Sequence, residues 1–248
     1  MNELATREGS GAMFDAIAER YDMLNRILSM GIDVHWRSLA VARLLANESL
    51  RRTPLRFLDL ATGTGDLALA IAEHYARAEV LGTDPSQGML QHGRRKVAEA
   101  SLEDRISLVM GDAQQIEADD ASFDGVSIAF GIRNVPDRER ALGEMARVTK
   151  PGGRVVILEL SEPKDQSVFG KIAQFHVHTM VPAIGAWLSG AKEYKYLQRS
   201  IAAFPAAEAF GEIMRGAGLD VIEILPLTFG VAHLYVATPH AHKGAHLS

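Results

Sequence analysis

The chain has 248 residues, of which 47% are hydrophobic and 23% charged, values typical of one globular domain with a sizeable core. Its 26 basic and 31 acidic residues give a formal net charge of −5, which argues against non-specific binding to DNA or to anionic membrane as the main activity. No cysteine is present, so disulfides, thiolate metal ligands and cysteine nucleophiles are excluded. Because the sequence contains neither a signal-peptide core nor a run of about 18 apolar residues, we expect a cytoplasmic protein.

The N-terminal part of the chain is predicted to be helical. Residues 1–12 are small and polar, and we expect them to be disordered. From Met13 to about Ala46 apolar residues recur at helical spacing, with a break at Gly31–Asp33. This pattern predicts two helices that cover the rest of the domain, over about 13–50.

Strand and helix signals alternate after this cover. The expected strands are 55–60, 79–83, 106–110, 123–130 and 154–160, and the expected helices are 66–77, 87–100 and 138–149. A mostly helical insert follows at about 165–204, then a helix at 208–217 and two strands at 221–225 and 231–237. The alternation predicts a parallel, doubly wound α/β sheet, and the last two strands predict an antiparallel hairpin on it. A seven-stranded, mostly parallel sheet with this hairpin is the Rossmann-like class I methyltransferase fold, expected here as one domain over 13–238 with a disordered tail at 239–248.

The loop after the first strand is glycine-rich. Gly63 and Gly65, with Thr64 between them, precede a helix that begins near Asp66. Glycines let the backbone approach a ligand closely, and in an open α/β sheet this loop lies at the carboxyl ends of the strands, where ligands bind. The alternative is a tight turn that needs glycine only for its geometry.

Two acidic residues follow the next two strands. Asp84 lies nineteen positions after Gly65, close to the spacing of about 20 expected for an acid that binds ribose hydroxyls. Asp84-Pro85 would also suit a helix N-cap. Asp112 could accept from an adenine amino group, with the Ala113 backbone at the ring edge, although a lone aspartate after a strand is usually a turn residue. Together they predict a nucleoside site.

These features alone do not separate a methyltransferase from an NAD(P)-dependent oxidoreductase, because Gly63–Ala68 also fits the dinucleotide motif. Four observations favour the methyltransferase: Asp59 before the glycine turn, Asp112, the Arg147–Arg154 segment that ends a helix and turns sharply into a strand, and the late hairpin. We interpret Asp59 as orienting the turn or meeting the amino-acid end of the cofactor.

Several motifs along the chain resemble those of one known protein family. They are Met13–Asp22, Leu24-Asn25, Leu28-Ser29, Asp59–Asp66, Phe130–Val135, Lys150–Gly153 running into Leu158–Ser161, Tyr194–Leu197, Ser200-Ile201 and Phe204-Pro205. On these residues the chain resembles the ubiquinone/menaquinone biosynthesis C-methyltransferase family over about 13–237. The Phe-Gly-Ile-Arg-Asn motif combined with the Tyr-Asp opening is the most discriminating part.

The resemblance implies S-adenosylmethionine as cofactor and places its contacts on Thr64, Asp84, Asp112 and Ala113. Ala129 stands where many relatives have a serine that contacts the cofactor, so only backbone or packing contact is left there. Many relatives also have histidine at the position of Asp33, which puts a catalytic role for the displaced His35 in doubt.

The resemblance further implies methylation of a ring carbon of a polyprenylated quinol, with demethylmenaquinol favoured over the benzoquinol precursor of ubiquinol. Arg133 and Asn134, and Tyr21 from the helical cover, are the expected catalytic residues, because a cationic or hydrogen-bonding group near the quinol oxygen stabilises a phenolate. The ordinary alternatives are a helix-capping turn at Arg133–Pro136 and a core aromatic at Tyr21. Methylation of another small aromatic or lipid, an oxidoreductase, and a cofactor-binding protein without catalysis are the rival functions.

The expected partners follow from this assignment. No histidine spacing suits a metal site, so no metal is expected. A lipophilic quinol is expected as substrate, with an apolar route or core packing over Phe169–Leu188, and no nucleic acid. Transient, peripheral contact with the inner membrane surface and a homodimer are both compatible with the sequence.

Overall fold

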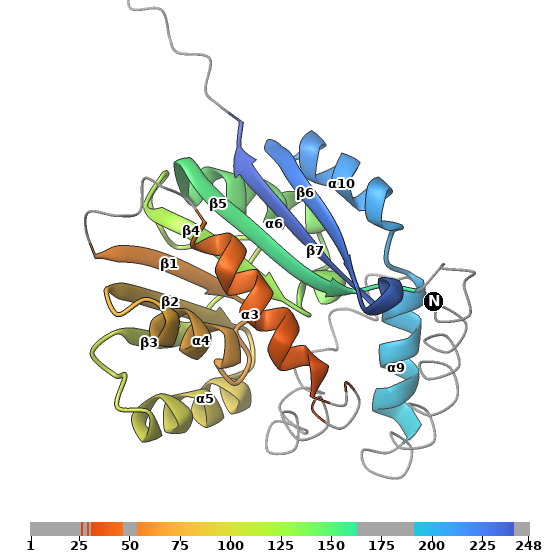
Figure 1. Cartoon of the computed structure of the whole chain (residues 1–248). Helices are drawn as coiled ribbons and strands as arrows, with labels where there is room; N and C mark the ends of the chain where they lie inside the picture. The colour runs from red at the N-terminus through yellow and green to blue at the C-terminus, as the bar shows by residue number, and fades with distance from the viewer. Residues whose placement is uncertain (1–25, 27–28, 30, 47–53, 163–190, 241–248) are drawn as a thin grey trace, which may run out of the picture.

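The computed structural model describes residues 26, 29, 31–46, 54–162 and 191–240, and they form one twisted sheet between two layers of helices (Figure 1). The strands are β1 (Leu55–Leu60), β2 (Ala78–Asp84), β3 (Ile106–Met110), β4 (Phe123–Ala129), β5 (Thr149–Leu160), β6 (Leu219–Leu227) and β7 (Ala232–Pro239). Their order is β3-β2-β1-β4-β5-β7-β6, and β7 is antiparallel to both of its neighbours. The predicted seven-stranded sheet with a C-terminal antiparallel hairpin is therefore confirmed.

The helices divide between the two faces of the sheet. One face carries α3 (Ile32–Leu44), α4 (Asp66–His74) and α5 (Gln87–Glu99), and the other carries α6 (Arg138–Val148) and α10 (Ala207–Gly216) (Figure 1). Two short helices lie at the strand ends: η2 (Ile132–Asn134) follows β4, and η4 (Thr228–Gly230) joins β6 to β7. Helix α9 (Ala191–Ala202) lies against η2.

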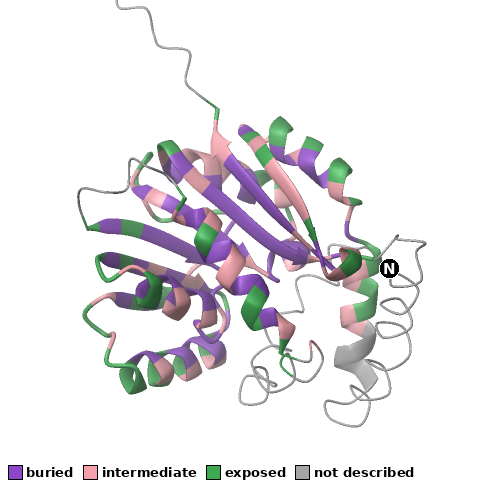
Figure 2. Cartoon of the chain, in the orientation of Figure 1, coloured by how far each residue is buried: buried purple, intermediate pink, exposed green. Residues whose placement is uncertain are grey.

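The core consists of two apolar clusters separated by the sheet, whose central strands are buried along most of their length (Figure 2). Side chains alternate between the clusters along each strand, so Val156 faces α3 and α4 while Ile157 faces α6 and α10. Tyr235 is the largest fully buried side chain, and its ring lies 5.0 Å from that of Phe210 in an edge-on arrangement. Burial of an apolar side chain such as Phe57 or Leu58 stabilises the fold by about 1.5–3 kcal/mol.

Most observed bounds lie within one or two residues of the predicted ones, and two differ by more. Helix α4 ends at His74 instead of Arg77, because Tyr75 is extended (φ −131°, ψ 102°). Strand β5 begins at Thr149 instead of Arg154, and the predicted sharp turn at Lys150–Gly153 is an irregularity inside it, between the pairs Phe123–Thr149 and Gly125–Arg154, with Gly152 at φ 76°.

In the described part of the chain, four of the six non-glycine residues with positive φ lie at the carboxyl edge of the parallel strands, and Ser101 and Ala121 lie elsewhere. Ala61 after β1 and Phe130 after β4 have φ values of 47° and 58°, and Thr228 and Phe229 in η4 have 44° and 57°. A left-handed conformation costs a non-glycine residue roughly 1–2 kcal/mol. Strain of this kind concentrates where a ligand site fixes the backbone, which points to this edge.

Some expectations fall outside the described residues. These are most of the helical cover including Tyr21, the apolar stretch Phe169–Leu188 and the tail beyond His240. Within the described ranges no helix is long and apolar enough to cross a membrane. The same part of the chain contains no group of three histidine or acidic side chains arranged to hold a metal ion.

Candidate cofactor and acceptor site

The glycine loop turns sharply between β1 and α4. Gly63 and Gly65 both have positive φ (57° and 79°), and the Gly65 N–H donates to the Thr62 carbonyl at 2.9 Å. A Cβ added to Gly63 would meet no atom within 4 Å. Glycine therefore meets a backbone requirement here and also leaves open space above the loop, as a closely bound ligand requires.

Asp84 holds this loop from the end of the neighbouring strand β2. Its Oδ2 accepts the Gly63 N–H at 2.9 Å, and its Oδ1 accepts the Ser86 N–H at 2.8 Å. The N-cap of α5 is Ser86, whose Oγ accepts the Met89 N–H at 3.2 Å, so the suggested Asp84 cap is wrong. The acid predicted to bind ribose thus lies directly beside the glycine loop.

Asp59 lies beneath the loop and is completely buried. It accepts hydrogen bonds from the hydroxyls of Thr62 (2.6 Å) and Ser127 (2.8 Å). Burial raises the pKa of Asp59 to about 6, although both hydroxyls and the charge of Arg37 act in the opposite direction. A buried carboxylate whose nearest partners are neutral favours a cationic group close by.

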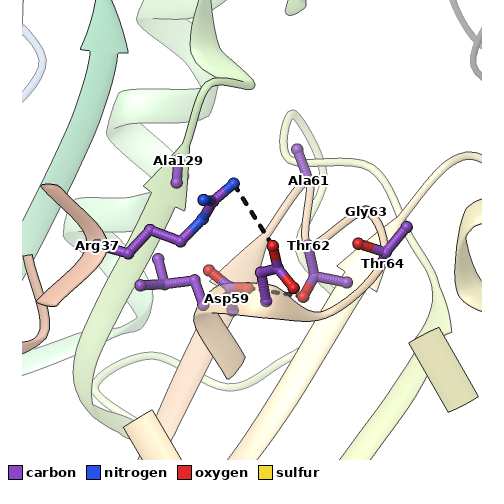
Figure 3. A pocket seen from close by; sticks show the side chains of 9 residues that line it. Arg37, Asp59, Ala61, Thr62, Gly63, Thr64 and Ala129 are labelled. Atoms are coloured by element: carbon purple, nitrogen blue, oxygen red, sulfur yellow. Dashed lines mark hydrogen bonds and ion pairs between the residues drawn. The ribbon is translucent and has the colours of Figure 1, made fainter. Parts of the chain in front are cut away.

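A pocket opens above Asp59 and contains about 330 Å³ of space, part of it open to solvent (Figure 3). The residues that line it are Arg37, Asp59, Ala61, Thr62, Gly63, Thr64, Asp66, Leu67 and Ala129. It brings together three of the residues predicted for the cofactor, namely Gly63, Thr64 and Ala129. At Ala129 only a methyl group faces the site that a serine hydroxyl would occupy.

The structure adds Arg37, which the sequence reasoning missed. Arg37 forms an ion pair with Asp33 one turn earlier on α3, so the unusual Asp33 serves to hold this arginine. Its Nη2 also lies 3.8 Å from Asp66 Oδ2. The signal in the sequence was the spacing of four between an acid and an arginine at the start of a helix.

Asp112 and Ala113 lie just after β3, at the same edge of the sheet as the ends of β1 and β2. Met110 at the end of β3 pairs with Asp84, so Asp112 follows on the far side of β2 from the glycine loop. Its carboxylate accepts the Gln114 N–H at 2.9 Å and the Gln114 side-chain amide at 3.0 Å. The turn interpretation of Asp112 therefore holds, and its oxygens lie at the exposed rim rather than in the pocket lining.

The acceptor motif after β4 is built around a buried ion pair. Arg133 Nη1 lies 2.5 Å from Glu159 Oε1, and the Arg133 N–H donates to Glu159 Oε2 at 3.1 Å. The guanidinium also donates to the Phe130 carbonyl at 2.6 Å. Neighbouring Asn134 accepts a hydrogen bond from the Tyr196 hydroxyl of α9 at 3.0 Å.

Glu159 is the second residue that sequence reasoning passed over as a site residue. The signal was an acid inside a strand, directly after the apolar run Val155–Leu158, since a buried acid needs a cation or several donors. The capping interpretation of this loop is wrong for the helix that follows, because the N-cap of α6 is Asp137, whose side chain accepts the Arg140 N–H at 3.0 Å. The hydrogen bond from the Asn134 N–H to the Gly131 carbonyl belongs to η2 itself.

Comparisons with solved structures support the fold. An S-adenosylmethionine-dependent methyltransferase from Aquifex aeolicus aligns with a TM-score of 0.54 and 16% identity, covering 79% of this chain and 90% of that one. The [4+2]-cyclase SpnF aligns with a TM-score of 0.69 and 16% identity, covering 95% and 97%. One architecture thus hosts different chemistries, so the fold alone does not give the reaction.

Proteins with similar sequences identify the family of this chain more specifically than the solved structures do. Demethylmenaquinone methyltransferase of Thermus thermophilus is 46% identical over 90% of this chain and 98% of its own length. The ubiquinone/menaquinone biosynthesis C-methyltransferase of Geotalea daltonii is 44% identical over 90% of this chain and 93% of its own. The model of the ubiE/COQ5 methyltransferase family matches residues 3–239, and the chain belongs to this family.

Proposed function

We propose that this chain is an S-adenosylmethionine-dependent C-methyltransferase that methylates the ring of a polyprenylated quinol. Demethylmenaquinol is the first choice of acceptor, and the benzoquinol precursor of ubiquinol is the second. The observation that carries the proposal is the identity of 46% to a demethylmenaquinone methyltransferase along almost the whole of both chains. The glycine loop, Asp59 and Asp84 supply a nucleoside-binding edge that fits the cofactor of such an enzyme.

The described residues fit this cofactor in charge and in shape. When bound, S-adenosylmethionine supplies an electrophilic methyl group on a sulfonium. Gly63 and Thr64 bring backbone to the pocket, and Asp84 offers a carboxylate to the ribose hydroxyls. Asp112 and Ala113 would border the adenine from the rim beyond β2, and the Asp59 carboxylate lies in the lining of the pocket. Two acids and one arginine line the pocket, and this excess of negative charge complements a cofactor with a net positive charge.

At the acceptor, we assign Arg133, Asn134 and Tyr21 to the quinol oxygen. An aromatic carbon becomes nucleophilic when a hydroxyl ortho or para to it loses its proton, so the reduced quinol is the acceptor. Arg133 stays protonated and cannot remove the proton, so it acts by holding the phenolate or a water in place. Glu159 and the Phe130 carbonyl fix the Arg133 guanidinium, and Tyr196 fixes the Asn134 amide.

A lipophilic acceptor also implies contact with a membrane surface, which we propose is transient. Two exposed hydrophobic residues support this: Val34 at the start of α3 and Phe229 in η4, 43% and 49% exposed. The Trp36 indole N–H donates to Thr228 Oγ1 at 3.0 Å and joins these two elements. A homodimer stays a prediction.

Binding and turnover measurements test the proposal together. Isothermal titration with S-adenosylhomocysteine and NADH identifies the nucleotide, and labelled S-adenosylmethionine with each quinol identifies the acceptor. We expect S-adenosylhomocysteine to bind and demethylmenaquinol to be methylated faster than the benzoquinol. Tighter binding of NADH would reject the methyltransferase assignment, and labelling of neither quinol would reject the acceptor class.

A further inference from the structure

We propose that Arg37 binds the carboxylate of the methionine part of the cofactor, an inference that rests on the proposed use of S-adenosylmethionine. That part of the cofactor carries both an ammonium and a carboxylate. Asp59 provides the negative charge that an ammonium needs, but a carboxylate needs a cation or several N–H donors. Arg37 is the cationic side chain in the lining of the pocket above the glycine loop.

The position of Arg37 is fixed by its own helix. It lies on α3, is 8% exposed, and forms an ion pair with Asp33, which is itself 3% exposed. Its guanidinium also lies over the Phe130 ring, 5.3 Å from the centroid. These contacts hold the side chain so that it reaches across Asp59 toward the loop at Thr62 and Gly63 (Figure 3).

The guanidinium keeps donors for a further acceptor. Within the described part of the chain its single hydrogen bond is from Nη1 to Asp33. Nη2 lies 3.8 Å from Asp66, beyond hydrogen-bond distance, and the fork of an arginine offers five N–H groups in all. A carboxylate entering the pocket can therefore accept from Arg37 without displacing Asp33.

Asp66 is shared between Arg37 and a second cation, so it neutralises Arg37 only in part. Lys96 on α5 forms an ion pair with Asp66 and also donates to Thr64 Oγ1 at 3.3 Å. Burial would raise the pKa of Asp66, but Lys96 and then Arg37 outweigh it and keep the pKa below its ordinary value. Lys96 is not among the residues that line the pocket, so Arg37 is the better partner for a ligand carboxylate.

The arrangement also explains how the cofactor is oriented. Asp59 below and Arg37 on the α3 side present opposite charges to the two charged groups of an amino acid. Reversing the ligand would place each group against a like charge, which is unfavourable in a partly buried site. Because Arg37 comes from α3, occupation of the pocket also links this helix to the sheet.

Isothermal titration with S-adenosylmethionine and decarboxylated S-adenosylmethionine, in the absence of a quinol, tests the proposal directly. The two ligands differ only in the carboxylate. Wild-type protein should prefer S-adenosylmethionine on the order of 10- to 100-fold, the usual effect of hydrogen bonds to a charged group. Arg37→Gln should lose most of this preference by weakening only the ligand with the carboxylate, and Arg37→Lys should keep part of it.

Two further variants control for a structural effect. Arg43→Ala removes an arginine from the same helix, where it pairs with Glu223 away from the pocket, and should keep the wild-type preference. Asp33→Asn combined with Arg37→Gln removes both members of the buried pair. This double variant should lose the preference for S-adenosylmethionine but be more thermally stable than Arg37→Gln alone. An Arg37→Gln protein with the wild-type preference, or with both ligands weakened equally, would overturn the proposal. Failure of the wild-type protein to bind either ligand would instead overturn the use of S-adenosylmethionine.

Discussion

Arg133 and Glu159 form an ion pair in which the side chain of Arg133 is 5% exposed and that of Glu159 is fully buried. Arg133 follows β4 and Glu159 lies near the end of β5, so the pair joins the acceptor loop to the adjacent strand. Two interpretations of Arg133, as a group that stabilises the quinol oxygen and as a structural residue, therefore apply to one side chain. A single substitution cannot separate them.

Replacing Arg133 by alanine should reduce both stability and rate. Glu159 would be left as an uncompensated buried charge, which costs about 3–5 kcal/mol of unfolding free energy. Single-turnover methyl transfer at saturating cofactor should fall on the order of 10²- to 10³-fold, the usual loss for one electrostatic donor. Melting curves and rapid-quench measurements give the two quantities.

The double variant Arg133→Ala with Glu159→Gln separates the two roles. It removes both buried charges, so most of the lost stability should return, but the rate should stay low. Recovery of the rate together with the stability would show that Arg133 has a structural role only.

Asp84→Ala should weaken binding of S-adenosylhomocysteine by roughly 1.5–3 kcal/mol, the scale for hydrogen bonds to a charged acceptor. Part of the loss comes from the Gly63 N–H, which loses its acceptor. Isothermal titration measures the change, with exposed Asp220→Asn as a matched control. Unchanged affinity in a folded Asp84→Ala protein would remove Asp84 from the site.

Asp59 should make the stability depend on pH in a defined direction. The pKa of this carboxyl is about 6 in the folded chain and near 3.8 when unfolded, so between these values the folded protein binds the extra proton. The unfolding free energy of the wild type, relative to Asp59→Asn, should therefore fall as pH rises through this window, by up to about 3 kcal/mol. Urea unfolding of both proteins from pH 4 to pH 7 measures this difference. A difference that stays constant with pH would mean that Asp59 titrates normally.

Tyr196→Phe should lower the rate of methyl transfer several-fold and leave cofactor affinity unchanged. The substitution removes the hydrogen bond to Asn134 Oδ1, whose net value is about 1 kcal/mol, and so frees the amide to rotate. Steady-state kinetics with titration of S-adenosylhomocysteine distinguish the two effects. Weaker cofactor binding in this variant would place Tyr196 in the nucleotide site instead.

The sheet was largely predictable because its signals are local. Strands such as 55–60 and 106–110 are short, mainly apolar segments bounded by turn residues, and they match the observed strands. The strand at 154–160 was predicted too short, because proline and glycine at Lys150–Gly153 indicate a turn, whereas β5 already pairs with β4 at Thr149 and its register resumes at Arg154. Such a tertiary effect is not visible in a local pattern.

The nucleotide side of the site was predictable for a similar reason. Gly63, Asp84 and Asp112 each follow a strand, and parallel strands bring their carboxyl ends to one edge. Arg37 and Glu159 were not predicted, because each acts through a partner on another element or turn. From the sequence alone, Arg37 is expected to be an exposed charge on a helix, and Glu159 an acid in a strand with no identified partner. Only the structure shows that Arg37 lines the pocket and that Glu159 pairs with Arg133.

Methyl transfer to the reduced and oxidised forms of demethylmenaquinone tests the central claim most directly. Methyl-labelled S-adenosylmethionine is mixed with the wild-type protein and either form in detergent, and the product is analysed by mass spectrometry for label on a ring carbon. We predict one labelled methyl group per ring with the quinol and none with the quinone, because only the quinol can provide an electron-rich ring. Label on oxygen, equal labelling of both forms, or no labelling of the quinol by a protein that binds S-adenosylhomocysteine would contradict the account.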